Sequence, residues 1–132
     1  MLASQAAVIA AVVAAIGADE VAKGLLGDPV RVWDLPPKGA AVPYVQVGGC
    51  ESRAVRGDSG AVEHVLGLSC VSRGIDLAEV RAVAAAVEGA LAGLVLEGLV
   101  SCDLRAVEVR RGAELSRGVG VMRVRVVVDL GG

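Results

Sequence analysis

The chain has 132 residues, of which 55% are hydrophobic and 21% are charged, and it carries a formal net charge of −2 and no Phe. A chain of this length buries roughly two thirds of its unfolded surface in one core and is too short for two cores. This composition excludes a disordered chain, and the near-neutral charge does not fit a dedicated nucleic-acid-binding protein. We therefore expect one domain spanning residues 1–132, with Val and Ala in the core in place of aromatic side chains.

The cysteines and the longest apolar segment indicate in which cellular compartment the protein is expected. Cys50, Cys70 and Cys102 lie far apart and form no CxxC pair, so we expect free thiols rather than a disulfide framework or a zinc site. The apolar run 6–16 is shorter than the roughly 20 residues of a membrane-spanning helix. No basic residue precedes this run, as one would in a signal peptide. These features predict a cytoplasmic protein without a membrane partner.

In the first half of the chain, hydrophobic spacing predicts one helix and two short strands. Val8, Val12 and Ile16 recur at the spacing of one helix face, and the Gly17-Ala18-Asp19 stretch can end the helix. Gly and Pro residues then separate short alternating segments that are typical of strands. In chain order we expect a helix at 3–16, a loop at 23–29, strands at 30–33 and 44–47, and a polar, mobile loop at 49–60.

In the second half, strict alternation and one apolar stripe predict three longer strands and a second helix. His64, Leu66 and Leu68 share one face of an alternating segment. Asp76 is placed to cap the following helix, with Glu79 as its capping-box partner. A change of phase near Ala106 predicts a β-bulge. In chain order we expect a strand at 61–72, a helix from 77, a strand at 99–110, a loop at 110–118 and a strand at 119–130.

This order of elements predicts the fold class. Two helices that cover one face of a mostly antiparallel or mixed five-stranded sheet are the simplest way to bury one apolar face of five strands. We therefore expect an α+β two-layer domain, without an internal repeat and without a linker that divides it.

The sequence contains no constellation of residues that is typical of an active site. The single histidine, His64, is in phase with the apolar face of its strand, and its neighbour Glu63 points to the other face. Metal-ligand spacing and a phosphate-binding loop are both missing from the sequence, so we expect no catalytic residue, no metal and no cofactor. Arg56-Gly57-Asp58 is interpreted as a turn rather than a cell-adhesion signal.

Arginine is concentrated in the last third of the chain, where six Arg residues between positions 105 and 125 are offset by two Glu residues. Such a cluster can lie near phosphates, can form an ordinary solvated strand face, or can contact another subunit. The planar guanidinium is enriched in protein interfaces because it can be desolvated against carboxylates. We favour an assembly contact.

Several segments, taken together and in order, resemble the tail-completion or tail-terminator family of phages and gene transfer agents. After an Ala-rich first helix come Val32-Trp33-Asp34 and Pro43-Tyr44-Val45, and then the polar Gly/Arg/Asp loop. The strand from His64 to Arg73, the Gly74 junction, the second helix and the closing Arg/Val strand complete the resemblance, which covers nearly the whole chain. Cys70 stands where an aromatic residue is expected in that family.

The resemblance implies a structural, non-enzymatic protein that forms a ring, usually of six subunits, on the head-proximal end of the tail tube. The ring stops tube polymerisation and offers a surface for head attachment. The implied partners are other copies of the chain, the major tail tube protein and a head-completion or connector protein, with DNA only in transit. The protein would assemble in the bacterial host cytoplasm and then reside at the head–tail junction of the particle.

If the protein forms such a ring, its arginines are candidates for the lumen or for contacts between proteins. Arg123 and Arg125 are candidates for the lumen of the ring or for charge pairs between subunits, and the sequence does not choose between these. The alternatives to a terminator are a head–tail connector, a small ligand-binding domain or enzyme, and a dimerisation module. Residues expected at the subunit or tube interface are Arg53, Arg56, Asp58, Arg110, Arg111 and Arg117.

Overall fold

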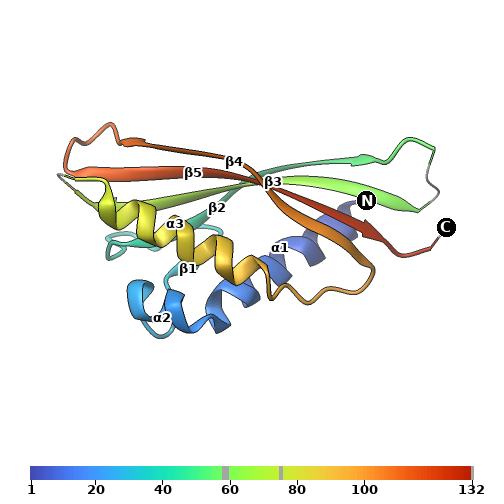
Figure 1. Cartoon of the computed structure of the whole chain (residues 1–132), viewed down its shortest axis with the longest axis horizontal. Helices are drawn as coiled ribbons and strands as arrows, with labels where there is room; N and C mark the ends of the chain where they lie inside the picture. Colours follow the sequence, from blue (N-terminus) through green and yellow to red (C-terminus); the bar gives the residue numbers. More distant parts are fainter. Residues whose placement is uncertain (58–59, 75, 132) are drawn as a thin grey trace.

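The computed structural model describes residues 1–57, 60–74 and 76–131, which form three helices and one five-stranded sheet. All three helices lie on the same face of the sheet (Figure 1). The predicted two-layer α+β fold is therefore confirmed. The helices are α1 (Leu2–Ala18), α2 (Glu20–Leu26) and α3 (Ala78–Leu91), and the strands are β1 (Val32–Trp33), β2 (Tyr44–Ala54), β3 (Ala61–Arg73), β4 (Leu99–Arg111) and β5 (Arg117–Asp129).

The sheet has the strand order β1-β2-β3-β5-β4. The short β1 is parallel to β2, and every other neighbouring pair is antiparallel. β3 and β5 form the long centre of the sheet, paired without interruption from Ala61 opposite Asp129 to Arg73 opposite Arg117. Their Val-rich alternation places every second side chain in the core, as the sequence predicts.

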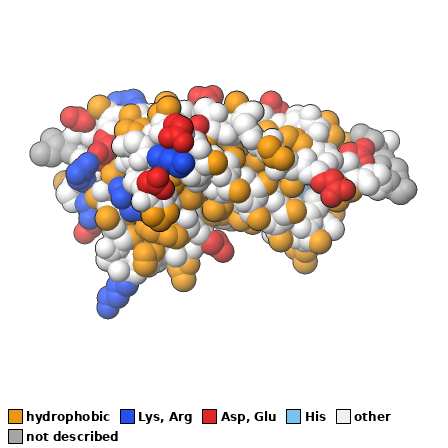
Figure 2. Space-filling view, turned by 90° about the horizontal axis from the view of Figure 1, so that it is seen from below, with side chains coloured by type: hydrophobic (Ala, Val, Ile, Leu, Met, Phe, Trp, Pro, Cys, Tyr) orange, Lys and Arg blue, Asp and Glu red, His pale blue; other side chains and the backbone are white. Residues whose placement is uncertain are grey.

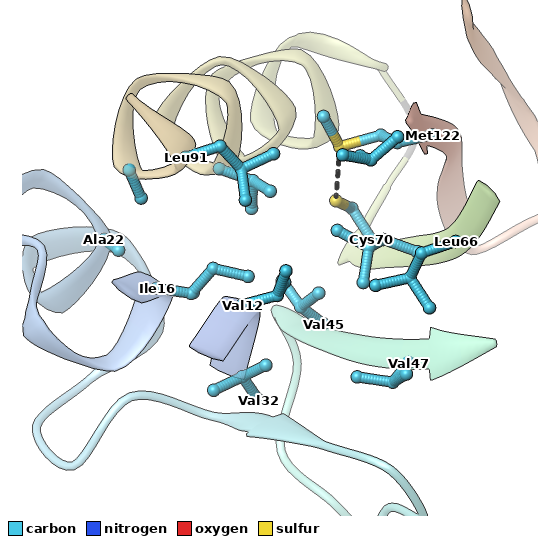
Figure 3. Close-up of a cluster of buried hydrophobic side chains, with 14 of the residues drawn as sticks. Val12, Ile16, Ala22, Val32, Val45, Val47, Leu66, Cys70, Leu91 and Met122 are labelled. Atoms are coloured by element: carbon cyan, nitrogen blue, oxygen red, sulfur yellow. Dashed lines mark hydrogen bonds between the residues drawn. The ribbon is translucent and has the colours of Figure 1, made fainter. Parts of the chain in front are cut away.

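The core lies between the helices and the sheet and is built almost entirely from aliphatic side chains (Figure 3). Val8, Val12 and Ile16 form the fully buried stripe of α1, at intervals of four residues. From β3 and β5, Leu66 and Met122 meet this layer, and burial of each such side chain contributes roughly 1.5–3 kcal/mol. Small residues let α3 approach the sheet closely, since a Cβ atom at Gly120 would lie 3.3 Å from a methyl group of Val80.

A third helix replaces the loop that the sequence predicts at 23–29. Asp19 ends α1 and also begins α2, because its carboxylate Oδ2 accepts a 2.9 Å hydrogen bond from the backbone N–H of Ala22. Ala22 and Leu26 are fully buried, so packing against the core outweighs the cost of Gly24 within the helix. The prediction of two helices was therefore wrong by one short helix.

β2 does not end at Gly48-Gly49, and the predicted loop at 49–60 was wrong for its first half. The pairing of β2 with β3 shifts by a residue between Val47 and Cys50, so the two glycines form a bulge and the strand continues to Ala54. A Cβ atom at Gly48 would lie 3.1 Å from the carbonyl oxygen of Gly67, so a side chain at this position would require the two strands to shift slightly apart. The bulge also inverts the faces: Val47 points to the core before it, and Ser52 does so after it.

The other irregularities follow the sequence more closely. β4 has a register shift between Leu104 and Ala106, as its change of phase predicts. At the start of α3, the N-cap is Leu77 rather than the predicted Asp76, although the Asp76 side chain accepts a 3.0 Å hydrogen bond from the backbone N–H of Ala78. The capping-box role of Glu79 was wrong, because this carboxylate binds the backbone N–H and the guanidinium of Arg73.

Within the described ranges, no single helix is long and apolar enough to span a membrane. α1 and α2 meet the length and hydropathy criteria only when they are counted together, and they are bent by 80° at Asp19.

Candidate assembly surfaces

The three helices leave the opposite face of the sheet uncovered, and we call this side the open face (Figure 1). Strand alternation decides which side chains point to it, because every second residue of β3 and β5 is in the core. The bulge at Gly48-Gly49 is responsible for the presence of Glu51 and Arg53 on this face of β2. The open face therefore carries both charged residues and valines from the four long strands.

One carboxylate joins three strands on the open face. Glu63 on β3 accepts a 2.8 Å hydrogen bond from Nε of Arg53 on β2 and a 2.5 Å hydrogen bond from Nε of Arg125 on β5. The hydrogen bonds from Arg125 and Arg53 hold the pKa of Glu63 below its ordinary value. This cluster of two guanidinium groups and one carboxylate has a net charge of +1.

Arg123 lies two residues before Arg125 on the same face but is differently placed. Its neighbours across the sheet are Gly67 on β3 and Ala106 on β4, which offer no side-chain acceptor. It is exposed, and it makes no ion pair with any residue that the structure describes. The sequence groups Arg123 with Arg125, whereas the structure makes Arg125 part of a charge cluster and leaves Arg123 open to an external partner.

Two shallow depressions of the open face meet at Arg123. One has a volume of about 400 Å³ and is floored by Gly49, Gly67, Val65 and Val121. The other, of about 630 Å³, lies on the β4 side and includes Glu108. Gly49 and Gly67 carry no side chain, and this creates the first depression. The bulge in β2 therefore changes the shape of the surface as well as the pairing of the strand.

The remaining predicted interface residues fall into two groups at opposite ends of the sheet (Figure 1). Arg53 at the end of β2 and Arg56 in the turn that follows it lie at one end, and the other three lie where β4 ends and β5 begins. Because β3 runs the whole way between them with 13 residues, the two ends are separated by roughly 40 Å at 3.3 Å per residue. Asp58 lies outside the described residues. The group at the second end comprises Arg110, Arg111 and Arg117.

The second arginine group is held by local contacts. Arg110 pairs with Glu108 at 3.0 Å, and Arg117 lies 3.9 Å from a carboxylate oxygen of Glu114. Nη1 of Arg111 donates to the carbonyl oxygen of Gly74, which ties the hairpin to the start of α3. Figure 2 shows that the Lys and Arg side chains visible on the helix-covered side gather toward this end of the molecule.

The first end is distinguished by a small basic depression of about 260 Å³. Arg53, Arg56 and Arg125 line it together with Glu63. Arg56 makes no ion pair within the described ranges, so it is the cation of this depression that remains open to a partner. The sequence analysis places Arg53 and Arg56 in one set with the arginines of the other end and separates Arg125 from them, whereas the β3–β5 register brings Arg125 to this depression.

His64 is fully buried in a polar network beneath the first turn of α1. Its Nε2 lies 2.9 Å from Oγ of Ser4, and its Nδ1 lies 2.6 Å from Oγ of Ser52. Gln5 donates to the same Ser52 hydroxyl and to the carbonyl oxygen of Cys50. Burial, and then the positive N-terminus, lowers the pKa of His64. The network anchors α1 on β2 and β3, and the burial of His64 confirms that it lies on the core-facing side of its strand.

Sequence reasoning missed the helical partners of this histidine. Ser4 precedes Val8, Val12 and Ile16 at the same four-residue interval, so a hydroxyl begins an otherwise apolar stripe. The position of Ser4 could have indicated this contact from the sequence, because a polar residue on a buried stripe requires a hydrogen-bonding partner. In the part of the chain that the structure describes, no group of three His, Cys, Asp or Glu residues is arranged to hold a metal ion.

The comparisons with known proteins agree with this architecture. The family model described as "Tail completion protein gp17" matches residues 10–129. Nineteen chains of solved structures match, including one from the "Virion of native gene transfer agent (GTA) particle". That chain is 27% identical, has a TM-score of 0.84, and aligns over 98% of the present chain and 99% of its own length. No curated protein matches. Because the family model covers nearly the whole chain, the protein belongs to the tail completion protein gp17 family.

Proposed function

We propose that this protein is a structural component of a phage or gene-transfer-agent particle, where it completes the tail. It forms a ring of about six subunits on the head-proximal end of the tail tube. The ring stops tube polymerisation and presents a surface to the head-completion or connector protein. The observation that carries this proposal is the similarity, over 98% of the chain, to a chain of a gene transfer agent virion.

The distribution of arginines supports a subunit with two different neighbours along its length. Arg53 and Arg56 lie at one end of the sheet, roughly 40 Å from Arg110, Arg111 and Arg117 at the other. A protein between a tube and a head must contact two unlike partners at opposite ends. We assign one arginine group to the tube protein and the other to the head-completion protein.

The open face supports a role in the passage of DNA. If this face lines the lumen, each subunit offers Arg123 to the phosphates, while Arg125 and Arg53 are partly neutralised by Glu63. Affinity for DNA rises steeply with each phosphate that is neutralised, so a lumen with few available cations allows DNA to slide. The proposed role is structural rather than enzymatic, and the buried His64 network serves to anchor α1.

The direct test mixes the full chain with tubes assembled from the partner tail tube protein and adds fresh tube subunits. Negative-stain microscopy should show one density at one end of each tube, and the tube length should stop increasing at that end. Continued elongation at the same rate would contradict the proposal. Binding to tail-free heads but not to tubes would instead favour a connector.

A matched pair of variants tests the two-ended arrangement. Arg56→Glu and Arg117→Glu reverse one exposed or half-buried arginine at opposite ends of the sheet. We expect one variant to lose tube capping by at least tenfold while it still joins heads once placed on a tube, and the other variant to show the reverse. Equal losses in both assays for both variants would contradict the assignment of one end to each partner.

A further inference from the structure

A small apolar groove lies between α3 and β4, and it shares only Val107 with the depression on the β4 side of the open face. It has a volume of about 170 Å³. β4 is the last strand of the sheet, so no described strand covers the outer side of the groove. Val107 is 46% exposed there, although it points to the same side as core residues. The apolar lining consists of Ala84, Ala85, Leu104, Val107, Val109 and Met122.

Two opposite charges on α3 flank this apolar floor. Arg81 and Glu88 both line the groove and are both exposed. They are seven residues apart, which places their Cα atoms roughly 10 Å from each other along the helix axis. Neither forms an ion pair with another described residue. The groove therefore presents an apolar centre with one positive and one negative group at its rim.

The opposite edge of the sheet carries a segment with the complementary pattern. Leu35, just after β1, is 84% exposed, although burial of such a side chain is favourable. Asp34 and Lys38 flank it, are exposed, and make no ion pair with any residue in the described ranges. Four residues of chain span at most roughly 13 Å, enough to match the spacing of Arg81 and Glu88.

This segment and the groove of the same subunit do not meet. β1 and β4 are the two edges of a sheet with three strands between them, which corresponds to roughly 19 Å at 4.8 Å per strand. The 84% exposure of Leu35 agrees with this separation. A surface at one edge that complements a different surface at the other edge is the arrangement of a head-to-tail contact, which closes into a ring at a fixed rotation.

We propose that the segment 34–38 of one subunit docks into the α3–β4 groove of the next copy of the chain. Leu35 then covers the apolar floor, Asp34 lies beside Arg81, and Lys38 lies beside Glu88. This contact rests on the proposed ring and specifies which surfaces join its subunits. It uses neither the arginine groups at the ends of the sheet nor the open face, which remain available to the tube, the head protein and DNA.

Charge reversal tests the pairing in the tube-capping assay. Asp34→Lys or Arg81→Asp alone places like charges together, so we expect each to reduce the fraction of capped tube ends at least tenfold. The double variant D34K/R81D restores opposite charges at every contact and should regain capping. Lys38→Glu and Glu88→Lys form a second, independent pair with the same expected pattern.

Mixing distinguishes a contact between subunits from one within a subunit. When D34K chains and R81D chains are combined in equal amounts, an alternating ring brings each segment to a groove of suitable charge. Capping by the mixture is therefore expected to recover, and native mass spectrometry should show rings containing both chains. If the double variant recovers but the mixture does not, the pairing is within one chain and the docking proposal is overturned.

Further variants separate the docking proposal from the proposed function. Leu35→Ser should fold normally, because Leu35 is exposed, and should reduce capping at least tenfold, whereas the control Glu97→Lys reverses an exposed charge elsewhere and should leave capping unchanged. If the wild-type chain caps tubes and all these variants cap equally well, only the docking is overturned. If the wild-type chain itself does not cap tubes, the proposed function fails, and the docking fails with it.

Discussion

The carboxylate of Glu63 and the guanidinium of Arg125, 62 positions apart in the chain, lie 2.5 Å apart on the open face of the sheet. They are diagonal neighbours on β3 and β5, since Val65 is directly opposite Arg125 and Val127 directly opposite Glu63. A second arginine, Arg53, binds the other oxygen of the same carboxylate. Glu63 therefore neutralises part of the positive charge that Arg53 and Arg125 bring to this face.

Replacing Glu63 by Gln should lower the thermal stability of the protein at pH 7, because two arginines lose their common carboxylate. The folded-state pKa of Glu63 is depressed, so its contribution to stability is present above the unfolded pKa of about 4.3 and is lost as the pH falls through the folded pKa. The difference in Tm between wild type and Glu63→Gln should therefore shrink between pH 6 and pH 3. A difference that stays constant over this range would contradict the charge-pair interpretation.

Arg123 and Arg125 should differ in their contribution to DNA binding by the assembled ring. Arg123 has no carboxylate partner among the described residues, so Arg123→Ala should reduce the slope of log K against log salt concentration by roughly one for each phosphate that it no longer neutralises. Arg125→Ala should change the slope less, since Glu63 already neutralises part of its charge. Fluorescence anisotropy with short duplex DNA at several salt concentrations measures both slopes. If the Arg123→Ala ring has the same slope as the wild-type ring, Arg123 does not contact the DNA.

Because His64 is buried, the free energy of unfolding is expected to fall in mild acid. Its folded-state pKa is lowered by burial, so the unfolded chain binds more protons than the folded chain just below pH 6.5. The free energy of unfolding should therefore fall as the pH decreases from about 6.5 toward the folded pKa. His64→Gln should remove this pH dependence and cost roughly 1–3 kcal/mol at pH 7.5, because buried hydrogen bonds to Ser4 and Ser52 are disturbed.

Urea unfolding of wild type and His64→Gln between pH 5 and pH 7.5 provides this measurement. Ser4→Ala is a milder control, since it removes one hydroxyl and keeps the imidazole. If wild type and His64→Gln lose stability in parallel as the pH falls, another group is responsible for the acid sensitivity.

Packing of α1 against the sheet should depend strongly on Ile16. This side chain is fully buried in the aliphatic core, so Ile16→Ala should lower the free energy of unfolding by roughly 2–5 kcal/mol. Val21→Ala provides a matched control on the next helix, because Val21 is 62% exposed and its truncation leaves no cavity. Chemical denaturation distinguishes the two variants. Comparable small losses would mean that α1 is not part of the cooperative core.

Much of the layer structure was predictable because it depends on local periodicity. Alternation along β3 and β5 and the apolar stripe of α3 each identify a buried face without knowledge of any partner. The change of phase near Ala106 likewise identified the bulge in β4. The extension of β2 was missed because its polar residues 49–54 form a strand only through hydrogen bonds to β3. α2 was missed because burial of Ala22 and Leu26 compensates for the unfavourable Gly24.

The sequence by itself determined the two long helices, the buried faces of the long strands, the resemblance to tail-completion proteins and the number of arginines. The tertiary structure decided what each arginine can do. Register across β2, β3 and β5 joined Arg53 and Arg125 to Glu63 and left Arg123 beside Gly67 and Ala106. Because β3 is 13 residues long, Arg56 lies far from Arg110, Arg111 and Arg117, at the other end of the sheet. Local patterns repeat over a few residues, whereas charge pairing depends on strands far apart in the chain, and only the folded sheet brings these together.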